Sequence, residues 1–357
     1  MYSLIFLSSV IFALLSQFKS EQSIKIILCL IIGFILIISA GTRSSDVGKD
    51  YEEYIRLFDL FPNFKGVDAS TFLLYEPATI LIPNIFLLIA GPHYYLNLTF
   101  ILFAFLGVSI KLYAIQKYRL FFLGIVVYVS SIYFLQEMVI IRAGVACALF
   151  LLSINDLVEG NNKKYFLKIT IALLFHFSSF IFILVWIFIK FKIKPKVLYA
   201  ILFLCFAIAL LKINLLTLLR IDSIFPKVRL YLDLLEITKE GPVNIFNFKI
   251  IFSLFFTVLF AFKASIFKGD KLFDVLFPIH IMSISLFFVL SPTAMVFSLR
   301  VFDLLSVVQI LLYPFLIYIF KERWIGYLII LTIAVFNFIY TFYLTDIFNY
   351  SYNSWII

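Results

Sequence analysis

Long apolar stretches follow one another along almost the whole chain, and polar connectors separate them. Twelve stretches are recognisable, near residues 2–16, 24–40, 72–90, 94–115, 120–136, 138–155, 165–189, 197–212, 246–264, 272–290, 300–320 and 324–343. Most have the roughly 17–25 residues that a helix needs to cross the hydrocarbon core of a bilayer. A backbone in lipid must satisfy its own hydrogen bonds, so these stretches predict helices, and the alternating strands of a membrane barrel are missing from the sequence. The pattern predicts an all-α polytopic integral membrane protein with about 10–12 transmembrane helices.

Composition supports the same fold class. Of the 357 residues, 64% are apolar and 14% are charged, whereas a soluble domain has about 45–50% and about 25%. The three cysteines, Cys29, Cys147 and Cys205, all lie inside apolar stretches, without a CxxC pair or a Cys/His spacing suited to a metal. We therefore interpret them as core residues and not as metal ligands.

The stretches predict a single membrane domain over residues 1–357, because no separate soluble domain interrupts them. The first stretch lacks a basic leader and a small-residue cleavage site, so we interpret it as a membrane helix and not as a signal peptide. Two connectors are long, at 41–71 and 213–245. Within the second, apolar residues recur at helical spacing over 225–235, which predicts a short amphipathic helix on the membrane surface.

The net charge of +9 arises from lysines and arginines that gather in connectors between the apolar stretches. No basic stripe with interleaved aromatic residues occurs, so nucleic-acid binding is not expected. Basic connectors instead favour the cytoplasmic side of a membrane. The basic clusters lie at 17–25, 111–119, 156–168, 190–196, 263–271 and 321–323.

Twelve full crossings would not place all of these clusters on one side. All the basic clusters lie on the cytoplasmic side if two of the segments enter and leave the membrane by the same face. The candidates are 72–90, which contains Pro77 and Pro83, and 165–189, which polar residues interrupt at 176–179. Broken helices at membrane depth occur only where they line a cavity. Both long connectors would then lie on the periplasmic or extracellular side. Twelve ordinary crossings that violate the charge rule remain the alternative.

Four polar residues stand in apolar surroundings, where a charged group costs at least roughly 2.5–3.5 kcal/mol. They are Glu76, Arg142, His176 and Arg300, and Asp303 follows Arg300 by one helical turn. Each also has a purely structural interpretation. Glu76 would be solvated at the interface, Arg142 would reach up to the headgroups, His176 would bond to another helix, and Arg300 would pair with Asp303.

The sequence contains no Walker loop, no GxGxxG fingerprint, no HExxH pair and no aspartate-rich loop of a metal-dependent sugar-nucleotide transferase. Two arginines near a membrane face nevertheless suit a phosphate ligand, because each guanidinium can donate paired hydrogen bonds to phosphate oxygens. A lipid-linked pyrophosphate would fit such a site. This chemistry alone is compatible with a transporter and with a transferase.

Five short motifs occur in order between about residues 40 and 305. They are RSSDVGKDYEEY at 43–54, LYEP at 74–77, IRAGVA at 141–146, FHFSS at 175–179 and LRVF at 299–302. Together they resemble the EpsG/Wzy family of membrane polysaccharide polymerases. The chain departs from that family's pattern at Ser179, where a small alanine is usual, and the aromatic residue that often follows the late arginine is less clear.

The resemblance implies a metal-independent glycosyltransferase without a cofactor, located in the bacterial cytoplasmic (inner) membrane. It would move a growing glycan from undecaprenyl pyrophosphate onto the next lipid-linked repeat unit at the outer face, and so build O-antigen, capsule or exopolysaccharide. Its partners would be the lipid-linked oligosaccharide, the bilayer, and a chain-length regulator and flippase of the same pathway.

The resemblance also implies roles for the motif residues. Arg142 and Arg300 would hold the donor pyrophosphate and neutralise the leaving group. Either His176 or Glu76 would be the general base for the acceptor hydroxyl. The loop 41–71 would bind the glycan, with flat aromatic faces and polar groups for sugar hydroxyls. The residues concerned are Arg43, Asp46, Asp50, Tyr51 and Tyr54.

Three other classes of protein compete with the polymerase. A transporter or flippase of lipid-linked oligosaccharide would use the same arginines, but would move its substrate without forming a bond. A membrane acyltransferase that modifies polysaccharide would use His176 as its catalytic histidine and would need an acyl-donor site. A non-enzymatic assembly subunit would need neither activity.

Overall fold

The computed structural model describes residues 1–15, 22–118, 120–220, 229, 243–293, 295–345, 347–348 and 352–356. Among these residues the regular structure is helical, apart from one isolated antiparallel bridge between Arg43 and Ser354. Seven of the described helices are long and apolar enough to cross a membrane: Ser23–Gly41, Tyr95–Gln116, Phe121–Met138, Ile141–Glu159, Lys271–Leu290, Met295–Tyr318 and Arg323–Leu344. The all-α polytopic membrane fold is therefore confirmed.

Shorter apolar helices account for the remaining predicted stretches: Tyr2–Leu15, Pro77–Ala90, Phe177–Lys190, Pro195–Leu210 and Phe248–Phe262. Each of the twelve apolar stretches thus contains helix. The amphipathic helix predicted at 225–235 lies outside the described residues.

The chain divides into two compact units, and each is described by itself. Unit 1 comprises Met1–Phe180 and Ile310–Ile357, and unit 2 comprises Ile181–Gln309. A single membrane domain over the whole chain stays a prediction. The division at 309/310 falls within the short helix α19 (Gln309–Leu312).

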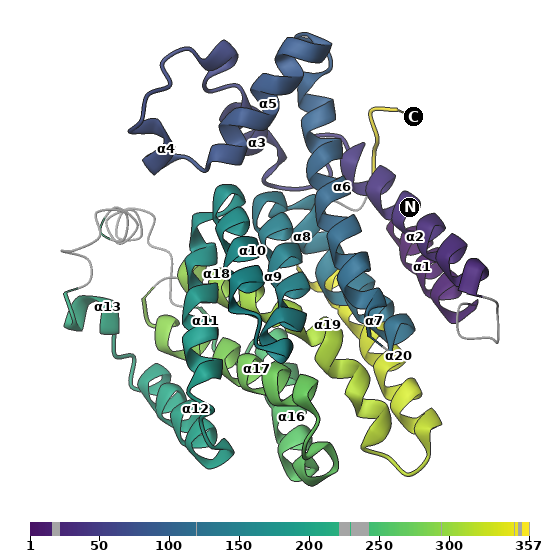
Figure 1. Cartoon of the computed structure of the whole chain (residues 1–357), viewed down its shortest axis with the longest axis vertical. Coiled ribbons are helices and arrows are strands. Elements are labelled where there is room, and N and C mark those ends of the chain that lie inside the picture. Colours follow the sequence, from purple (N-terminus) through teal and green to yellow (C-terminus); the bar gives the residue numbers. More distant parts are fainter. Residues whose placement is uncertain are drawn as a thin grey trace. The chain divides into compact units, whose positions relative to one another are not determined.

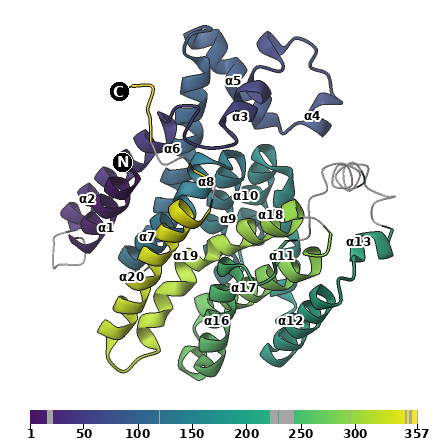
Figure 2. The ribbon, with the colours of Figure 1, turned by 180° about the vertical axis from the view of Figure 1, so that it is seen from behind.

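Unit 1 contains most of the motif residues, and Figures 1 and 2 show its helices. Its helices are α1 (Tyr2–Leu15), α2 (Gln22–Gly41), α3 (Tyr51–Phe58), α4 (Thr71–Leu74), α5 (Pro77–Ala90), α6 (Tyr95–Gln116), α7 (Phe121–Tyr128), α8 (Phe134–Met138), α9 (Ile141–Glu159), α10 (Asn162–Phe175) and α20 (Arg323–Ile339). Two π-helical stretches, Val129–Tyr133 and Tyr340–Leu344, continue α7 and α20.

Unit 2 contains α11 (Ile181–Lys190), α12 (Pro195–Leu210), α13 (Leu215–Leu218), α16 (Phe248–Phe262), α17 (Lys271–Leu290) and α18 (Met295–Leu305). Apolar side chains of α12, α16, α17 and α18 form its core, among them Cys205, Ile250, Phe288 and Phe302. Cys205 is buried, as is Cys147 of unit 1.

Small residues let α2 and α6 approach closely in unit 1. A Cβ atom at Gly41 would come within 2.9 Å of the Ile101 Cα, and one at Gly33 would lie 3.2 Å from the Leu112 side chain. The end of α2 is thus level with the early part of α6, so the two helices run antiparallel. Close packing on small residues is typical of membrane helices.

Both segments that the sequence predicts to be broken are broken. The helix α10 ends at Phe175, and His176 is extended with φ −156° and ψ 115° before a 3₁₀ turn at Phe177–Phe180. In the earlier segment α4 ends at Leu74, and a new helix, α5, begins at Pro77. Pro83 does not interrupt α5.

The loop after α2 folds back as the helix α3, which packs on α6. Tyr51 stacks on Phe100 with ring centroids 4.3 Å apart, and Phe58 stacks on Phe103 at 5.7 Å. Figure 1 shows α3, α4 and α5 gathered at one end of unit 1, beyond the ends of α9 and α10. The site described next lies at that end.

Candidate functional site

Glu76 lies immediately before α5, and the local sequence explains its backbone. Pro77 is the first residue of α5, and a proline favours an extended conformation in the residue before it. Glu76 accordingly has φ −60° and ψ 132°. Its carbonyl oxygen accepts hydrogen bonds from the Thr79 N–H (2.9 Å) and the Thr79 hydroxyl (2.6 Å). The turn is thereby fixed, and the Glu76 carboxylate contacts α9 and the end of α10.

Arg142 is the second residue of α9 and contacts both Glu76 and α3. Its Nη1 donates a hydrogen bond to Glu76 Oε2 over 2.6 Å. Its guanidinium lies over the ring of Tyr54, 5.5 Å from the centroid. The Arg142 side chain remains 26% exposed, against 11% for the Glu76 side chain. Part of the Arg142 side chain therefore stays accessible while it is paired with the carboxylate.

His176 approaches the same carboxylate from the other side. Its N–H donates to the Ala172 carbonyl, and its own carbonyl accepts from the Ser179 N–H, each over 3.0 Å. The break after α10 places His176 Nδ1 3.4 Å from Glu76 Oε1, and the imidazole is 12% exposed. Ser179 is fully buried behind this turn, so a small residue is needed there.

Glu76 lies outside the seven candidate spans, and the pKa of its carboxyl group is strongly lowered. Burial by itself would raise the pKa of Glu76. The hydrogen bond with His176 and the charge of Arg142 act in the opposite direction and lower the pKa from 4.5 to about 2. Glu76 is therefore ionised near neutral pH. Such a carboxylate is suited to orient its two neighbours, and it accepts a proton poorly.

Comparison with known proteins now bears on this constellation. The model of the EpsG family matches residues 26–354, a range that includes Glu76, Arg142 and His176. This chain belongs to the EpsG family. Neither the curated proteins nor the solved structures compared with it gave a significant match. Membership confirms the resemblance seen in the motifs, and it supports a polymerase-like role in polysaccharide synthesis for this multi-pass membrane protein.

The first EpsG-family motif places Arg43 and Asp46 in different surroundings. Arg43 is 1% exposed and donates through Nη1 to the Ala40 carbonyl. Its guanidinium lies 5.3 Å from the ring centroid of Tyr51 and 5.0 Å from that of Phe100. Asp46 is half-buried, and hydrogen bonds from the Ser44 hydroxyl and the Asn353 amide lower its pKa.

The two tyrosines of this motif are buried, Tyr51 to 7% and Tyr54 to 6% exposure. In this structure their rings support Arg43 and Arg142 and do not present free faces to solvent. Asp50 is half-buried just before α3. A glycan-binding role stays a prediction for all five residues, Arg43, Asp46, Asp50, Tyr51 and Tyr54.

Arg300 belongs to unit 2, where it is an exposed residue of α18. Asp303, one turn later, accepts a hydrogen bond from Lys249 Nζ of α16 over 3.2 Å. Asp303 thus has a cationic partner on a neighbouring helix. Because Arg142 and Arg300 lie in different units, the pyrophosphate clamp that combines them stays a prediction.

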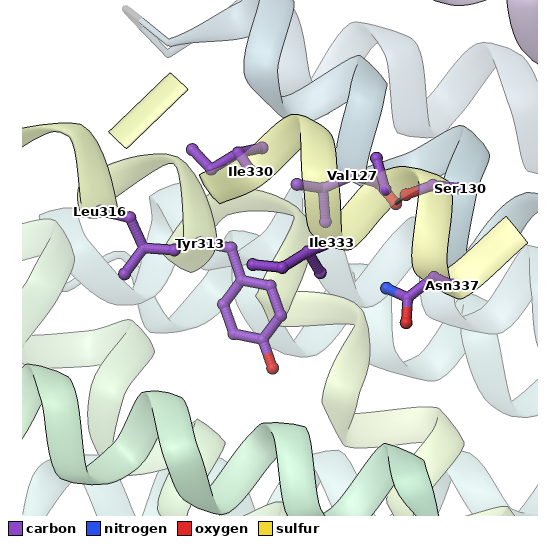
Figure 3. A pocket seen from close by; sticks show the side chains of 8 residues that line it. Val127, Ser130, Tyr313, Leu316, Ile330, Ile333 and Asn337 are labelled. Carbon is purple, nitrogen blue, oxygen red and sulfur yellow. Dashed lines mark hydrogen bonds between the residues drawn. The ribbon is translucent and has the colours of Figure 1, made fainter. Parts of the chain in front are cut away.

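A small pocket lies elsewhere in unit 1, between α7, α20 and the segments next to them. Figure 3 shows its mainly aliphatic lining, to which Ser130, Tyr313 and Asn337 add polar groups. None of the motif residues lines it. Within the described parts of the chain, no group of three or more His, Cys, Asp or Glu side chains is arranged to hold a metal ion.

Two features were not found from the sequence. The C-terminal segment docks beside the end of α2: the Ser44 N–H donates to the Asn353 carbonyl and the Trp355 N–H to the Thr42 carbonyl, each over 3.0 Å. No local pattern connects residues more than 300 positions apart.

In addition, Lys111 was assigned to a basic connector from the sequence, and this is wrong. It lies inside α6, fully buried, and pairs with Glu137.

Proposed function

We propose that this protein is a polysaccharide polymerase of the bacterial cytoplasmic (inner) membrane. It joins undecaprenyl-pyrophosphate-linked oligosaccharide repeat units into O-antigen, capsule or exopolysaccharide chains. The observation that carries the proposal is the convergence of Glu76, Arg142 and His176 on one point of an EpsG-family chain. These side chains come from three separate segments and supply an anion ligand, a candidate base and a carboxylate that orients both.

In the proposed transfer, a hydroxyl oxygen of the acceptor repeat unit attacks the anomeric carbon of the donor glycan. The bond from that carbon to the pyrophosphate oxygen breaks, and undecaprenyl pyrophosphate leaves with the electron pair. His176 takes the hydroxyl proton through Nε2, because its Nδ1 faces Glu76. The ionised Glu76 holds the ring and stabilises the imidazolium that forms.

Arg142 is the proposed ligand of the leaving pyrophosphate, and Arg300 is the proposed second ligand. The partial exposure of the Arg142 side chain supports this role. A guanidinium that already lies in place stabilises the developing negative charge without further reorganisation. The proposed step uses neither a nucleotide sugar nor a metal ion, so EDTA should leave the rate of chain growth unchanged.

The proposed orientation puts the site at the outer face. In unit 1, basic residues mark one end of three helices. Lys25 lies in the first turn of α2, Lys117 follows the end of α6, and Arg323 is the first residue of α20. The site and the loop 42–76 lie at the opposite ends of these helices. Basic connectors favour the cytoplasm, which supports an outward-facing Glu76, Arg142 and His176.

The test uses the purified full-length protein in lipid vesicles with lipid-linked repeat units as the added substrate. A polymerase should produce a ladder of chain lengths on the lipid and release undecaprenyl pyrophosphate in proportion. The variant His176→Gln should be inserted normally and should not produce the ladder. Movement of the labelled lipid between leaflets without a ladder would instead identify a transporter and refute the proposal.

A further inference from the structure

A second charged cluster lies inside unit 1, among helices that are long enough to span the membrane. Lys111 of α6 and Glu137 of α8 form an ion pair whose side chains are 0% and 1% exposed. Tyr128 donates its hydroxyl to the same carboxylate oxygen, Glu137 Oε1, over 3.0 Å. Ionisable groups in such helices are costly and are usually retained for a function. The proposed transfer uses none of these three residues, so the cluster needs its own explanation.

Lys111 has a further partner on the helix that carries Arg142. Its Nζ also donates to the carbonyl oxygen of Gly144 over 2.8 Å. Gly144 belongs to the first turn of α9 and follows Arg142 by two positions. One ammonium group therefore connects α6 to residues on both sides of the break between α8 and α9, because Glu137 precedes that break and Gly144 follows it.

The break itself has no local feature that would fix it. The helix α8 ends at Met138, and α9 begins at Ile141 without a proline and without a side-chain cap at Ile140. The N–H groups of Val139 and Ile140 both donate to the Leu135 carbonyl, over 3.1 and 2.9 Å. Tertiary contacts must therefore set the direction in which α9 departs, and the Lys111–Glu137 pair is a buried charged contact beside the break.

Two glycines make room for the cluster. A Cβ atom at Gly107 of α6 would overlap Glu137 Oε2, and one at Gly144 would overlap the carbonyl oxygen of Gln136. Within the described part of the chain, Glu137 Oε2 has no hydrogen-bond partner. The carboxylate is thus held through Oε1 alone, by Lys111 and Tyr128.

We propose that Lys111 and Glu137 are positioning residues that fix the start of α9 and thereby aim Arg142 at Glu76. The inference rests on the proposed function of that site. Arg142 lies between the break and Gly144, so a displaced first turn would move its guanidinium away from the carboxylate. Glu76 would then lose a neighbouring positive charge, and its pKa would rise from about 2 toward the ordinary value.

The test compares two double variants of the full-length protein in lipid nanodiscs. Lys111→Met with Glu137→Gln removes both charges at once, so that neither is left buried and unpaired. The matched control, Lys168→Met with Asp156→Asn, removes another ion pair that includes a residue of α9, near the opposite end of that helix. Hydrogen–deuterium exchange is measured over 139–145 and over 156–168.

We expect faster exchange over 139–145 in the first double variant and not in the control. Chain growth should fall by about tenfold to a hundredfold at equal protein levels, as for a misplaced binding group. On the acid limb of its pH profile, the rate of the double variant should fall more steeply than that of the wild type, because Glu76, which holds the proposed base His176, would also be protonated there. The control should keep the wild-type rate and profile.

Unchanged exchange over 139–145 would overturn the inference, whatever the protein catalyses. Faster exchange with an unchanged rate and acid limb would also overturn it, because the pair would then serve the fold alone. Failure of the proposed function would be recognised separately, since the wild-type protein itself would make no polymer. A third variant, Lys111→Arg with Glu137 intact, keeps the ion pair. If the double variant is slow while Lys111→Arg keeps most of the wild-type rate, the positioning role is supported.

Discussion

The two candidates for the general base are separated by one pair of substitutions, His176→Gln and Glu76→Gln. Glutamine keeps much of the size and polarity of each side chain but cannot take up a proton. A positioned base contributes about 10²–10⁴-fold to a rate. We expect His176→Gln to lose that factor, because histidine is the commonest general base near neutral pH, whereas the Glu76 carboxyl has a pKa of about 2.

The structure also limits what Glu76→Gln should cost. The pKa of Glu76 falls from 4.5 to about 2, which corresponds to about 3 kcal/mol of favourable interaction with the ionised carboxylate. If all of this interaction served to hold His176 and Arg142 in place, its loss would slow chain growth by at most about 300-fold. Glu76→Gln should therefore be the milder of the two substitutions.

The assay is the initial rate of chain growth in vesicles, at saturating lipid-linked repeat unit and equal protein density. Binding of the lipid-linked substrate is measured in parallel, since His176→Gln should keep it. The reverse order of severity, with an inactive Glu76→Gln and normal chains from His176→Gln, would refute the reasoning and make Glu76 the base. Normal chains from both would mean that neither residue moves the proton.

The remaining predictions concern the arginines, acid stability and orientation. Arg142→Lys and Arg300→Lys keep the charge but lose the paired donors, so each should be inserted normally and strongly impaired in chain growth; full activity of both would restrict the arginines to folding or topology. The ionised Glu76 carboxylate stabilises the fold above its ordinary pKa of 4.5, and this contribution disappears as the pH falls through about 2. The difference in thermal stability between the wild type and Glu76→Gln should therefore shrink over that range, and a constant difference would contradict it. In a variant without native cysteines, a cysteine at Ser45 should react with an impermeant thiol reagent in spheroplasts, while one at Lys163 should be protected. The opposite labelling would invert the proposed orientation.

Much of the fold could be predicted from the sequence, because a bilayer leaves the backbone few choices. An apolar stretch of sufficient length must satisfy its own hydrogen bonds, so each stretch contains helix. The break at Pro77 was also readable, since proline acts on the residue directly before it. The polar interruption at His176 was equally local, and α10 ends there. Such features depend on neighbouring residues, which a sequence displays directly.

Contacts between distant segments were decided by the tertiary structure. The sequence singled out Glu76, Arg142 and His176 because polar groups in apolar segments are energetically unfavourable. The packing of α5, α9 and α10 then brought these side chains within hydrogen-bonding reach. The sequence suggested Tyr51 and Tyr54 as sugar-binding residues, but both are buried in the structure. Their rings lie against Arg43 and Arg142 and do not face solvent. Nothing local distinguishes a tyrosine that faces a groove from one that faces a helix.

The sequence by itself determined that the chain is a helical membrane protein of the EpsG type, and it singled out candidate residues for its chemistry, because hydrophobic length and short motifs are local properties. Lys111 marks the limit of that information. In the sequence it stands next to other basic residues and was therefore assigned to a connector. In the structure α6, α8 and α9 approach closely at Gly107 and Gly144, and Lys111 is buried against Glu137. Its environment depends on which helices pack together, and only the tertiary structure decides that.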